Sequence, residues 1–215
     1  PDRPEIDVMR WIAIFLLCTA ACSSPRGDEP AAEQAQQAQQ AQQAQPLPAV
    51  VEAPAHDEFR RAARSSTGKL QIQLKQELSH AMGEGGAGAA VGVCSSKATE
   101  LTAQVSEETG LEVRRVSIRN RNPANQASVG EAAILAAMAA QPSLADTLVV
   151  RDGQPLYMRA IRISNELCLT CHGMAEDLDP AVMAQIDEFY DGDKATGFSE
   201  GDLRGAFVVK PLTTE

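Results

Sequence analysis

The sequence has few aromatic residues, since Phe, Trp and Tyr make up 4% of its 215 residues. Hydrophobic residues nevertheless make up 44%, enough for a packed core in at least part of the chain. The core must therefore be aliphatic and rich in Ala, or it must gain bulk from something that is not an amino acid. No apolar run reaches the roughly 20 residues that a membrane-spanning helix needs, which excludes a polytopic membrane protein.

Positive charge is also scarce. The chain has 19 Lys and Arg residues against 29 Asp and Glu, for a formal net charge of −10. Binding to a phosphate backbone needs clustered positive charge, so we do not expect nucleic acid as a partner. The length is that of about one domain.

The N-terminal segment has the pattern of an export signal. Met9 and Arg10 precede an apolar run over residues 11–21 that only Thr19 interrupts. A basic residue, a short apolar core and then small residues are typical of a secretory signal peptide. Residues 1–8 carry acidic side chains where such a signal needs positive charge, so we expect translation to start at Met9.

Small residues precede Cys22 in Thr19-Ala20-Ala21-Cys22, as in the lipobox of bacterial lipoproteins. The alternative is a plain cleaved signal with an incidental Cys22. Cys18 fits less well, because the preceding Leu17 is too large for the cleavage pocket. We predict a signal peptide over residues 1–22 and lipidation at Cys22. The protein would then be anchored by lipid on the periplasmic side of a bacterial membrane.

Residues 23–55 have the composition of a spacer. They are rich in Pro, Ala and Gln, and residues 35–45 repeat Ala-Gln-Gln with a period of three. Such a segment cannot bury enough apolar surface to offset the entropy of ordering it. We predict a disordered tether over 23–55, followed by one folded domain over 56–215.

The patterns in this domain predict helices first and strands later. Leu residues four apart at 70, 74 and 78 predict a helix over 57–82, which the Gly-rich segment 83–88 ends. Asp152-Gly153 predicts a tight hairpin turn. The absence of a βαβ rhythm favours an α+β fold with an antiparallel sheet. The other expected elements are a weaker helix over 91–104, a strand over 111–118, a polar loop over 119–125, a helix over 129–140, hairpin strands over 148–151 and 156–163, and a short strand over 206–209.

The chemistry of the chain is concentrated in Cys168-Leu169-Thr170-Cys171-His172, which is the C-x-x-C-H attachment pattern of c-type haem. Two thiols three residues apart on a helical turn reach the two vinyl groups of one porphyrin edge. The adjacent imidazole then faces the iron. We predict one covalent haem c, held by thioether bonds to Cys168 and Cys171 and ligated by His172. The export signal agrees independently, because haem c is attached outside the cytoplasm in bacteria.

Three other interpretations of C-x-x-C fit the sequence less well. A thioredoxin-like redox pair belongs in a βαβ pattern, which this sequence lacks. A zinc site would want a second Cys/His pair, whereas the remaining Cys94, His56 and His80 are scattered. A structural disulfide between cysteines this close is strained.

One histidine leaves the sixth iron position open or filled by a distal residue. Cys94 is a candidate because it is the thiol left over after the signal and the haem motif, although a lone cysteine can also be a small buried hydrophobe. The full set of candidates is Cys94, His56, His80, Met82, Met138, Met158, Met174 and Met183.

Several segments of the domain occur in an order that matches a known family. They are Val91-Gly92-Val93-Cys94, the strand 113–118, Arg121-Asn122-Pro123-Ala124-Asn125 with Glu131, the haem motif 168–173, and the closing segments 193–198 and 201–206. With them, the domain resembles a bacterial family of single-haem c-type cytochromes with a PAS-like fold, first seen structurally in a cyanobacterial member. The resemblance implies a PAS-like antiparallel sheet with flanking helices and a long N-terminal helix.

The same resemblance implies that His172 and Cys94 are the two axial ligands of the iron. Gly130 and Asp191 depart from the family pattern. We expect these departures to affect the packing of their loops and not the haem site. Haem propionates need cations or amides. The polar loop over 119–125 has such side chains, and the candidates are Arg119, Arg121, Asn122 and Asn125. The alternative is that this loop is a solvated turn.

A thiolate ligand stabilises ferric iron and lowers the reduction potential. Its loss on reduction would open a site for a diatomic ligand, so we predict a redox or gas sensor on a membrane tether. The alternative is an electron-transfer cytochrome. No output segment follows the last predicted strand, so we expect a separate redox or signalling protein as partner. We expect no enzyme, because the carboxylates after the haem motif fit a solvated helix start; they are Glu176, Asp177 and Asp179.

Overall fold

The computed structural model describes residues 54–212. The predicted signal peptide, Cys22 and residues 23–53 of the predicted tether lie outside these residues. Within the described part, no helix combines the length and the apolar character needed to cross a membrane.

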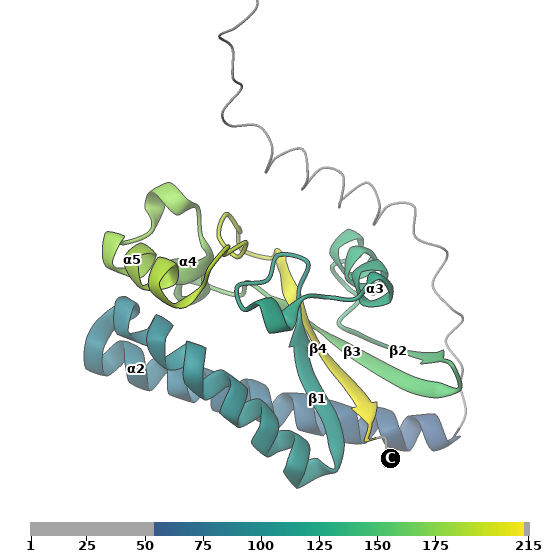
Figure 1. Cartoon of the computed structure of the whole chain (residues 1–215). Helices are drawn as coiled ribbons and strands as arrows, with labels where there is room; N and C mark the ends of the chain where they lie inside the picture. The colour runs from purple at the N-terminus through teal and green to yellow at the C-terminus, as the bar shows by residue number, and fades with distance from the viewer. Residues whose placement is uncertain (1–53, 213–215) are drawn as a thin grey trace, which may run out of the picture. The chain divides into compact units, whose positions relative to one another are not determined.

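The described chain folds into four α-helices, two short 3₁₀ helices and one sheet of four antiparallel strands in the order β1-β4-β3-β2. This confirms the predicted α+β fold, in which a long helix precedes an antiparallel sheet flanked by helices (Figure 1). The elements are α2 (Pro54–Thr109), β1 (Leu111–Val116), η2 (Pro123–Asn125), α3 (Val129–Ala140), β2 (Asp146–Arg151), β3 (Gln154–Arg162), α4 (Glu166–His172), η3 (Ala175–Asp177), α5 (Pro180–Phe189) and β4 (Leu203–Pro211).

Helix α2 is bent into two arms at Gly86, where the backbone adopts φ 73° and ψ −171°. The sequence predicted a break over 83–88, but the chain needs only this one residue, because a positive φ is readily available to glycine. The arms run back against each other (Figure 1), and an ion pair joins Lys69 of the first arm to Glu108 of the second. Leu70 and Val105 are buried together between the arms and the sheet.

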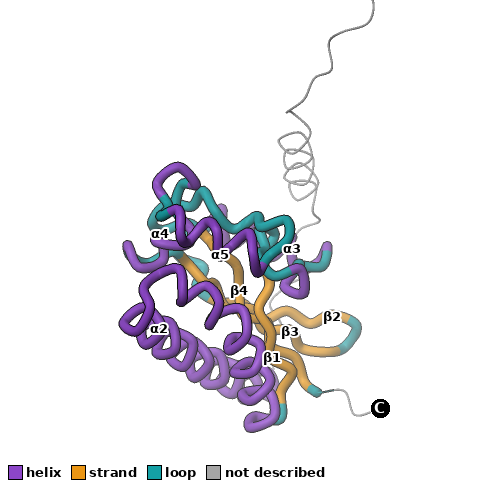
Figure 2. Tube along the Cα trace, turned by 60° about the vertical axis from the view of Figure 1, so that its left-hand side comes forward, coloured by secondary structure: helices purple, strands orange, loops and turns teal. Residues whose placement is uncertain are grey.

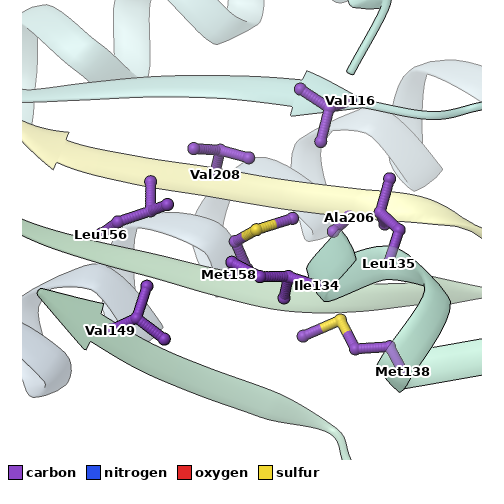
Figure 3. Packing of buried hydrophobic residues seen from close by; sticks show 9 residues of the cluster. All are labelled: Val116, Ile134, Leu135, Met138, Val149, Leu156, Met158, Ala206 and Val208. Atoms are coloured by element: carbon purple, nitrogen blue, oxygen red, sulfur yellow. The ribbon is translucent and has the colours of Figure 1, made fainter. Parts of the chain in front are cut away.

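One face of the sheet packs against α3. Side chains alternate along a strand, so Val116 of β1, Met158 of β3 and Val208 of β4 share this face. They are buried with Ile134 and Met138 of the Ala-rich helix α3 (Figure 3). Burying apolar surface, at about 25 cal/mol per Å², is the main force that docks this helix.

The other face of the sheet packs against α2. Val113, Tyr157 and Phe207 are buried there with side chains from both arms of the helix. Helices α4 and α5 lie at the end of the sheet away from the β2–β3 turn, above α2 (Figure 2). As a result, three parts of the fold face one another. They are the end of the sheet, the bend of α2, and helix α4.

The β2–β3 hairpin is confirmed, with positive φ at Asp152 (51°) and Gly153 (75°). Strands β2 and β3 each begin two residues before the predicted start, and β3 ends one residue earlier, at Arg162; β1 and β4 also differ from the prediction. Strand β1 ends at Val116, because the backbone N–H of Ser117 donates to Asn125 instead of to the sheet. Strand β4 covers nine residues and pairs on both sides, because the apolar run at 206–209 is the buried centre of a longer strand.

The sequence predicted a helix start at the carboxylates 176–179 but gave helix α5 no range. Asp179 caps its N-terminus by accepting a hydrogen bond from the backbone of Ala181, and Pro180 occupies its first turn. Glu176 and Asp177 lie in the exposed turn before it, as expected for a solvated helix start. The buried Val182 and Ile186 pack α5 against the second arm of α2.

Candidate functional site

A cavity of about 590 Å³ lies between α2, α4 and the end of the sheet. Both arms of α2, the strands β1, β3 and β4, the polar loop before η2 and helix α4 all contribute to its wall. Its volume falls in the range of about 300–1,000 Å³ that is usual for ligand and cofactor sites. Among its lining residues are Cys94, Cys168, Cys171 and His172.

Helix α4 carries the Cys-x-x-Cys-His motif into this wall. Asn165 caps the helix by accepting a hydrogen bond from the backbone N–H of Cys168, and Gly173 ends it by donating to Leu169. A side chain at Gly173 would place its Cβ 2.7 Å from the Leu169 oxygen, so the turn requires glycine. Residues three apart on a helix share one face, which brings Cys168 and Cys171 to the same side.

The surroundings of α4 also bear on the alternatives to haem. Helix α4 lies in the connection from β3 to β4, which are antiparallel neighbours, whereas a thioredoxin-like pair belongs in a βαβ unit. Cys94, Cys168 and Cys171 are free thiols. Within residues 54–212, no group of three or more His, Cys, Asp or Glu residues is arranged to hold a metal ion.

The imidazole of His172 is fixed by the loop after α5. Its Nδ1 lies 2.7 Å from the backbone oxygen of Ala195, and the ring of Phe198 meets it edge-on at 6.2 Å between centroids. A carbonyl oxygen only accepts, so Nδ1 carries the proton and Nε2 keeps a lone pair. Burial, followed by the charges of Arg204 and Arg121, holds the pKa of His172 well below its usual range. The ring is therefore in the neutral form that binds metals.

Cys94 approaches the same cavity from the second arm of α2. Burial is the main reason why the pKa of its thiol is raised, and the nearby thiol of Cys171 adds to the effect. Arg115 and Arg121 act in the opposite direction by favouring the thiolate. Cys94 thus lies close enough to both the motif and these cations to interact with them.

Close packing against α5 sets the position of the arm that carries Cys94. A Cβ at Gly92 would lie 3.0 Å from Cε2 of Phe189, and one at Gly88 would lie 3.4 Å from the backbone oxygen of Ala181. The two glycines are one turn apart and let the helices approach. The apolar stretch before Cys94 is therefore packed against α5 as well as facing the cavity.

The structure narrows the candidates for a distal ligand. Of the eight that the sequence offered, Cys94 and Met82 line the cavity. Met138 and Met158 are buried in the core on the α3 side, and His80 is exposed beside Glu84. The remaining candidates lie elsewhere: Met174 is exposed, Met183 packs within the α5 cluster, and His56 lies in the first turn of α2.

The polar loop is only partly at the cavity. Arg121, Asn122 and Asn125 line it, whereas Arg119 does not. The Arg119 guanidinium donates to backbone oxygens in the segment 194–197 and lies 4.0 Å from the centre of the Phe198 ring. Asn122 uses its side-chain oxygen to cap η2. The sequence therefore placed four polar residues at one site, and the fold brings three of them there.

Arg121 supports the motif as well as lining the cavity. Its Nε donates to Asp193 over 2.9 Å, and its Nη2 donates to the backbone oxygen of Cys171 over 2.7 Å. The side chains of the Arg121–Asp193 pair are only 10% and 9% exposed. This pair joins the polar loop, the end of α4 and the loop that holds His172.

Sequence reasoning missed four arginines of the wall, which are Arg115, Arg159, Arg162 and Arg204. Strand alternation could have placed Arg115, because it lies two residues after the buried Val113 and on the same sheet face. Burial lowers the pKa of Arg115, and burial together with repulsion from Arg121 lowers the pKa of Arg204 to about 10. Tyr190 also lines the cavity, from the end of α5.

Comparison with known proteins gives two matches. The Tll0287-like family model matches residues 28–211. Among solved structures, the crystal structure of the cyanobacterial heme-protein Tll0287 is similar, with a TM-score of 0.59. The two chains are 24% identical, and the match covers 76% of this chain and 99% of that chain. A search of the curated proteins found no match.

Proposed function

The chain belongs to the Tll0287-like family, and from this premise we propose that it is a haem protein whose cavity between α2, α4 and the sheet receives the porphyrin. The observation that carries the proposal is the meeting of Cys94, Cys168, Cys171 and His172 around one cavity of cofactor size. The similar solved structure is that of a heme-protein, which agrees with it.

The motif on α4 would hold one haem covalently. Cys168 and Cys171 are free thiols on one side of the helix, and both line the cavity. Each would form a thioether bond to the porphyrin edge. His172 would ligate the iron through Nε2, because Nδ1 donates to the backbone of Ala195. That hydrogen bond also makes Nε2 of the imidazole more basic and therefore a stronger ligand for a metal.

Cys94 would be the second residue to hold the iron. Its thiol is half-buried, and Arg115 and Arg121 stabilise its anionic form. Binding to a ferric centre removes the thiol proton, and the charge of the metal offsets the cost of burying the thiolate. Met82 is the other sequence candidate at the cavity, so it is the natural competitor.

We propose that the protein works as a redox or gas sensor. When bound, the haem supplies an iron whose charge changes by one on reduction. Cys94 would bind strongly in the ferric state and more weakly in the ferrous state, where its thiolate can take a proton and leave. A diatomic ligand would then have a free position. If Cys94 instead stays bound in both states, the chain serves as an electron-transfer cytochrome.

The proposed setting is the periplasmic side of a bacterial membrane. The pattern of residues 9–22 supports export and lipidation at Cys22, and residues 23–55 would form a tether. A haem domain on such a tether needs a redox or signalling protein within its reach. The net charge of −10 argues against nucleic acid as that partner.

The proposal is tested by the absorption spectra of the purified holoprotein in its oxidised and reduced forms. We expect thiolate-to-iron charge transfer in the ferric spectrum of the wild type, and its loss in Cys94→Ser together with a higher reduction potential. Met82→Leu is the matched control and should keep the wild-type ferric spectrum. An unchanged spectrum in Cys94→Ser would assign the ligand elsewhere.

Covalent attachment has a separate test. The protein is made in cells with a working haem c maturation system, denatured, and extracted with acidic acetone. Mass spectrometry should then find the polypeptide with the added mass of one haem, and Cys168→Ala/Cys171→Ala should lack it. A wild-type polypeptide without this added mass would refute the central proposal.

A further inference from the structure

The charge of the cavity wall is opposite to that of the protein. The chain has a formal net charge of −10, yet no Asp or Glu among residues 54–212 lines the cavity. The cationic residues that line it are Lys75, Arg115, Arg121, Arg159, Arg162 and Arg204. Buried charge of one sign without a counter-charge is costly, so this wall is suited to an anion.

Arg115 is the clearest unpaired cation of this wall. It stands on β1 opposite Phe207 of β4, and both residues line the cavity. Its Nε is buried and makes no hydrogen bond with any residue of the described chain. No carboxylate among residues 54–212 forms an ion pair with it, and the groups that attract it are Tyr190 and Cys94.

Arg204, the second residue of β4, is similar. Its Nε is buried and unpartnered within the described chain, while one Nη donates to the backbone oxygen of Arg119 over 3.0 Å. Asp193 attracts it, but that carboxylate is already paired with Arg121. Arg115, Arg119 and Arg121 all repel Arg204.

The other three arginines of the wall have partners of their own, and Lys75 is exposed. Arg121 holds Asp193, Arg162 donates to the backbone oxygens of Met138 and Gly201, and Arg159 reaches Thr67. Arg115 and Arg204 are thus the two guanidinium groups at the cavity whose buried Nε lacks an acceptor among residues 54–212.

We propose that Arg115 and Arg204 bind the two propionate carboxylates of the haem. The inference rests on the proposed function, because it assumes that the cavity receives a porphyrin. Guanidinium pairs with carboxylate through two parallel hydrogen bonds, and an Nε–H is one of the usual donors. This reassigns a role that the sequence pattern gave to the 119–125 loop, where Arg119 is occupied by backbone oxygens and Arg121 by Asp193.

The test uses the holoprotein with Arg115→Gln and Arg204→Gln. The matched control is Arg114→Gln, since Arg114 neighbours Arg115 on β1 but faces α3 and pairs with Glu131. Resonance Raman spectra report the propionate bending modes, and a redox titration reports the reduction potential. We expect both cavity variants to shift these modes. Their potential should fall below that of the wild type, because removing a nearby positive charge stabilises ferric iron. The control should show neither change.

Lysine variants distinguish the loss of a propionate contact from a general loss of folding. Arg115→Lys and Arg204→Lys keep the charge but lose the planar fork, so the propionate modes should shift while the potential stays near the wild-type value. Haem-loaded variants with unchanged modes and potential would overturn the inference and leave the proposed function standing. A shift of the propionate modes in only one of the two cavity variants would overturn the assignment of both arginines to propionates. A wild type that carries no haem would instead refute the proposed function.

Discussion

The Nδ1 atom of His172 and the backbone oxygen of Ala195 lie 2.7 Å apart, although the two residues belong to different segments on either side of α5. Arg121 reinforces this contact by donating to Cys171, next to His172, and to the side chain of Asp193. The direction of the imidazole is therefore set by two loops rather than by α4 alone.

Replacing Arg121 with Gln should destabilise the fold, because it leaves the carboxylate of Asp193 buried without its cation. Removing one partner of a buried pair costs about 3–5 kcal/mol, and we expect a loss near the lower figure, because the backbone N–H of Ala195 still donates to Asp193. Urea unfolding at equilibrium measures it.

The control for Arg121 is Arg64→Gln, which breaks an ion pair with Asp146 in which the Arg64 side chain is 55% exposed. An exposed pair contributes about 0–1 kcal/mol. Equal losses in the two variants would contradict the idea that Arg121 supports the site from a buried position. The double variant Arg121→Gln/Asp193→Asn should lose less than the sum of its single changes.

Gly205→Ala should weaken the pairing of β1 with β4. A Cβ at this position would lie 2.3 Å from the backbone oxygen of Val116, so one strand must move. Overpacking of this kind costs about 1–3 kcal/mol, measured by thermal or urea unfolding. Gly83→Ala is the control. Its Cβ would meet nothing within 4 Å, and in this helix it should raise stability by about 0.4–1 kcal/mol.

Ser128→Ala should unravel the start of α3. Ser128 and Glu131 form a capping box in which each side chain accepts from the backbone of the other. Loss of the cap costs about 0.5–2 kcal/mol. Glu131→Gln should also destabilise, because Glu131 is 3% exposed and its carboxylate pairs with Arg114. Neither residue lines the cavity, so the haem spectrum should stay unchanged in both variants. A changed spectrum in either variant would contradict the idea that the packing of α3 is independent of the site.

Labelled palmitate should enter the wild-type protein and not Cys22→Ala, because Thr19-Ala20-Ala21-Cys22 has the spacing of a lipobox. Cys18→Ala should be labelled like the wild type. The alternative is a signal peptide that is cleaved without lipidation. It would be supported if the protein were absent from the membrane fraction and the soluble chain had an unmodified N-terminus.

Local patterns predicted much of the fold because short-range chemistry decides it. The range of α3 was predicted as residues 129–140, and the Asp152-Gly153 turn determines the hairpin register. The single bend at Gly86 could not be chosen among several nearby glycines, because a local pattern does not include the contacts between the two arms of α2. The extent of helix α5 was missed for a related reason, since its packing involves Gly88 and Gly92 in a distant segment.

The candidate site divides in the same way. The Cys-x-x-Cys-His motif is local, so Cys168, Cys171 and His172 could be named from spacing, and they do line one cavity. Arg204 could not, because β4 reaches the cavity only by pairing with β1 and β3 at long sequence separation. Arg119 was misplaced because a loop sequence does not tell which of its polar side chains turn back to the backbone.

The central place of β4 affects the order in which the domain can be completed. In chain order the segment with Cys168 and His172 lies between β3 and β4, which are neighbours in the sheet. Until residues 203–211 have been synthesised, β1 has no strand to pair with, and the β2–β3 hairpin stays apart from it. Pairings between distant segments also form slowly. Both thiols of the motif therefore belong to a segment that precedes the strand needed to close the sheet.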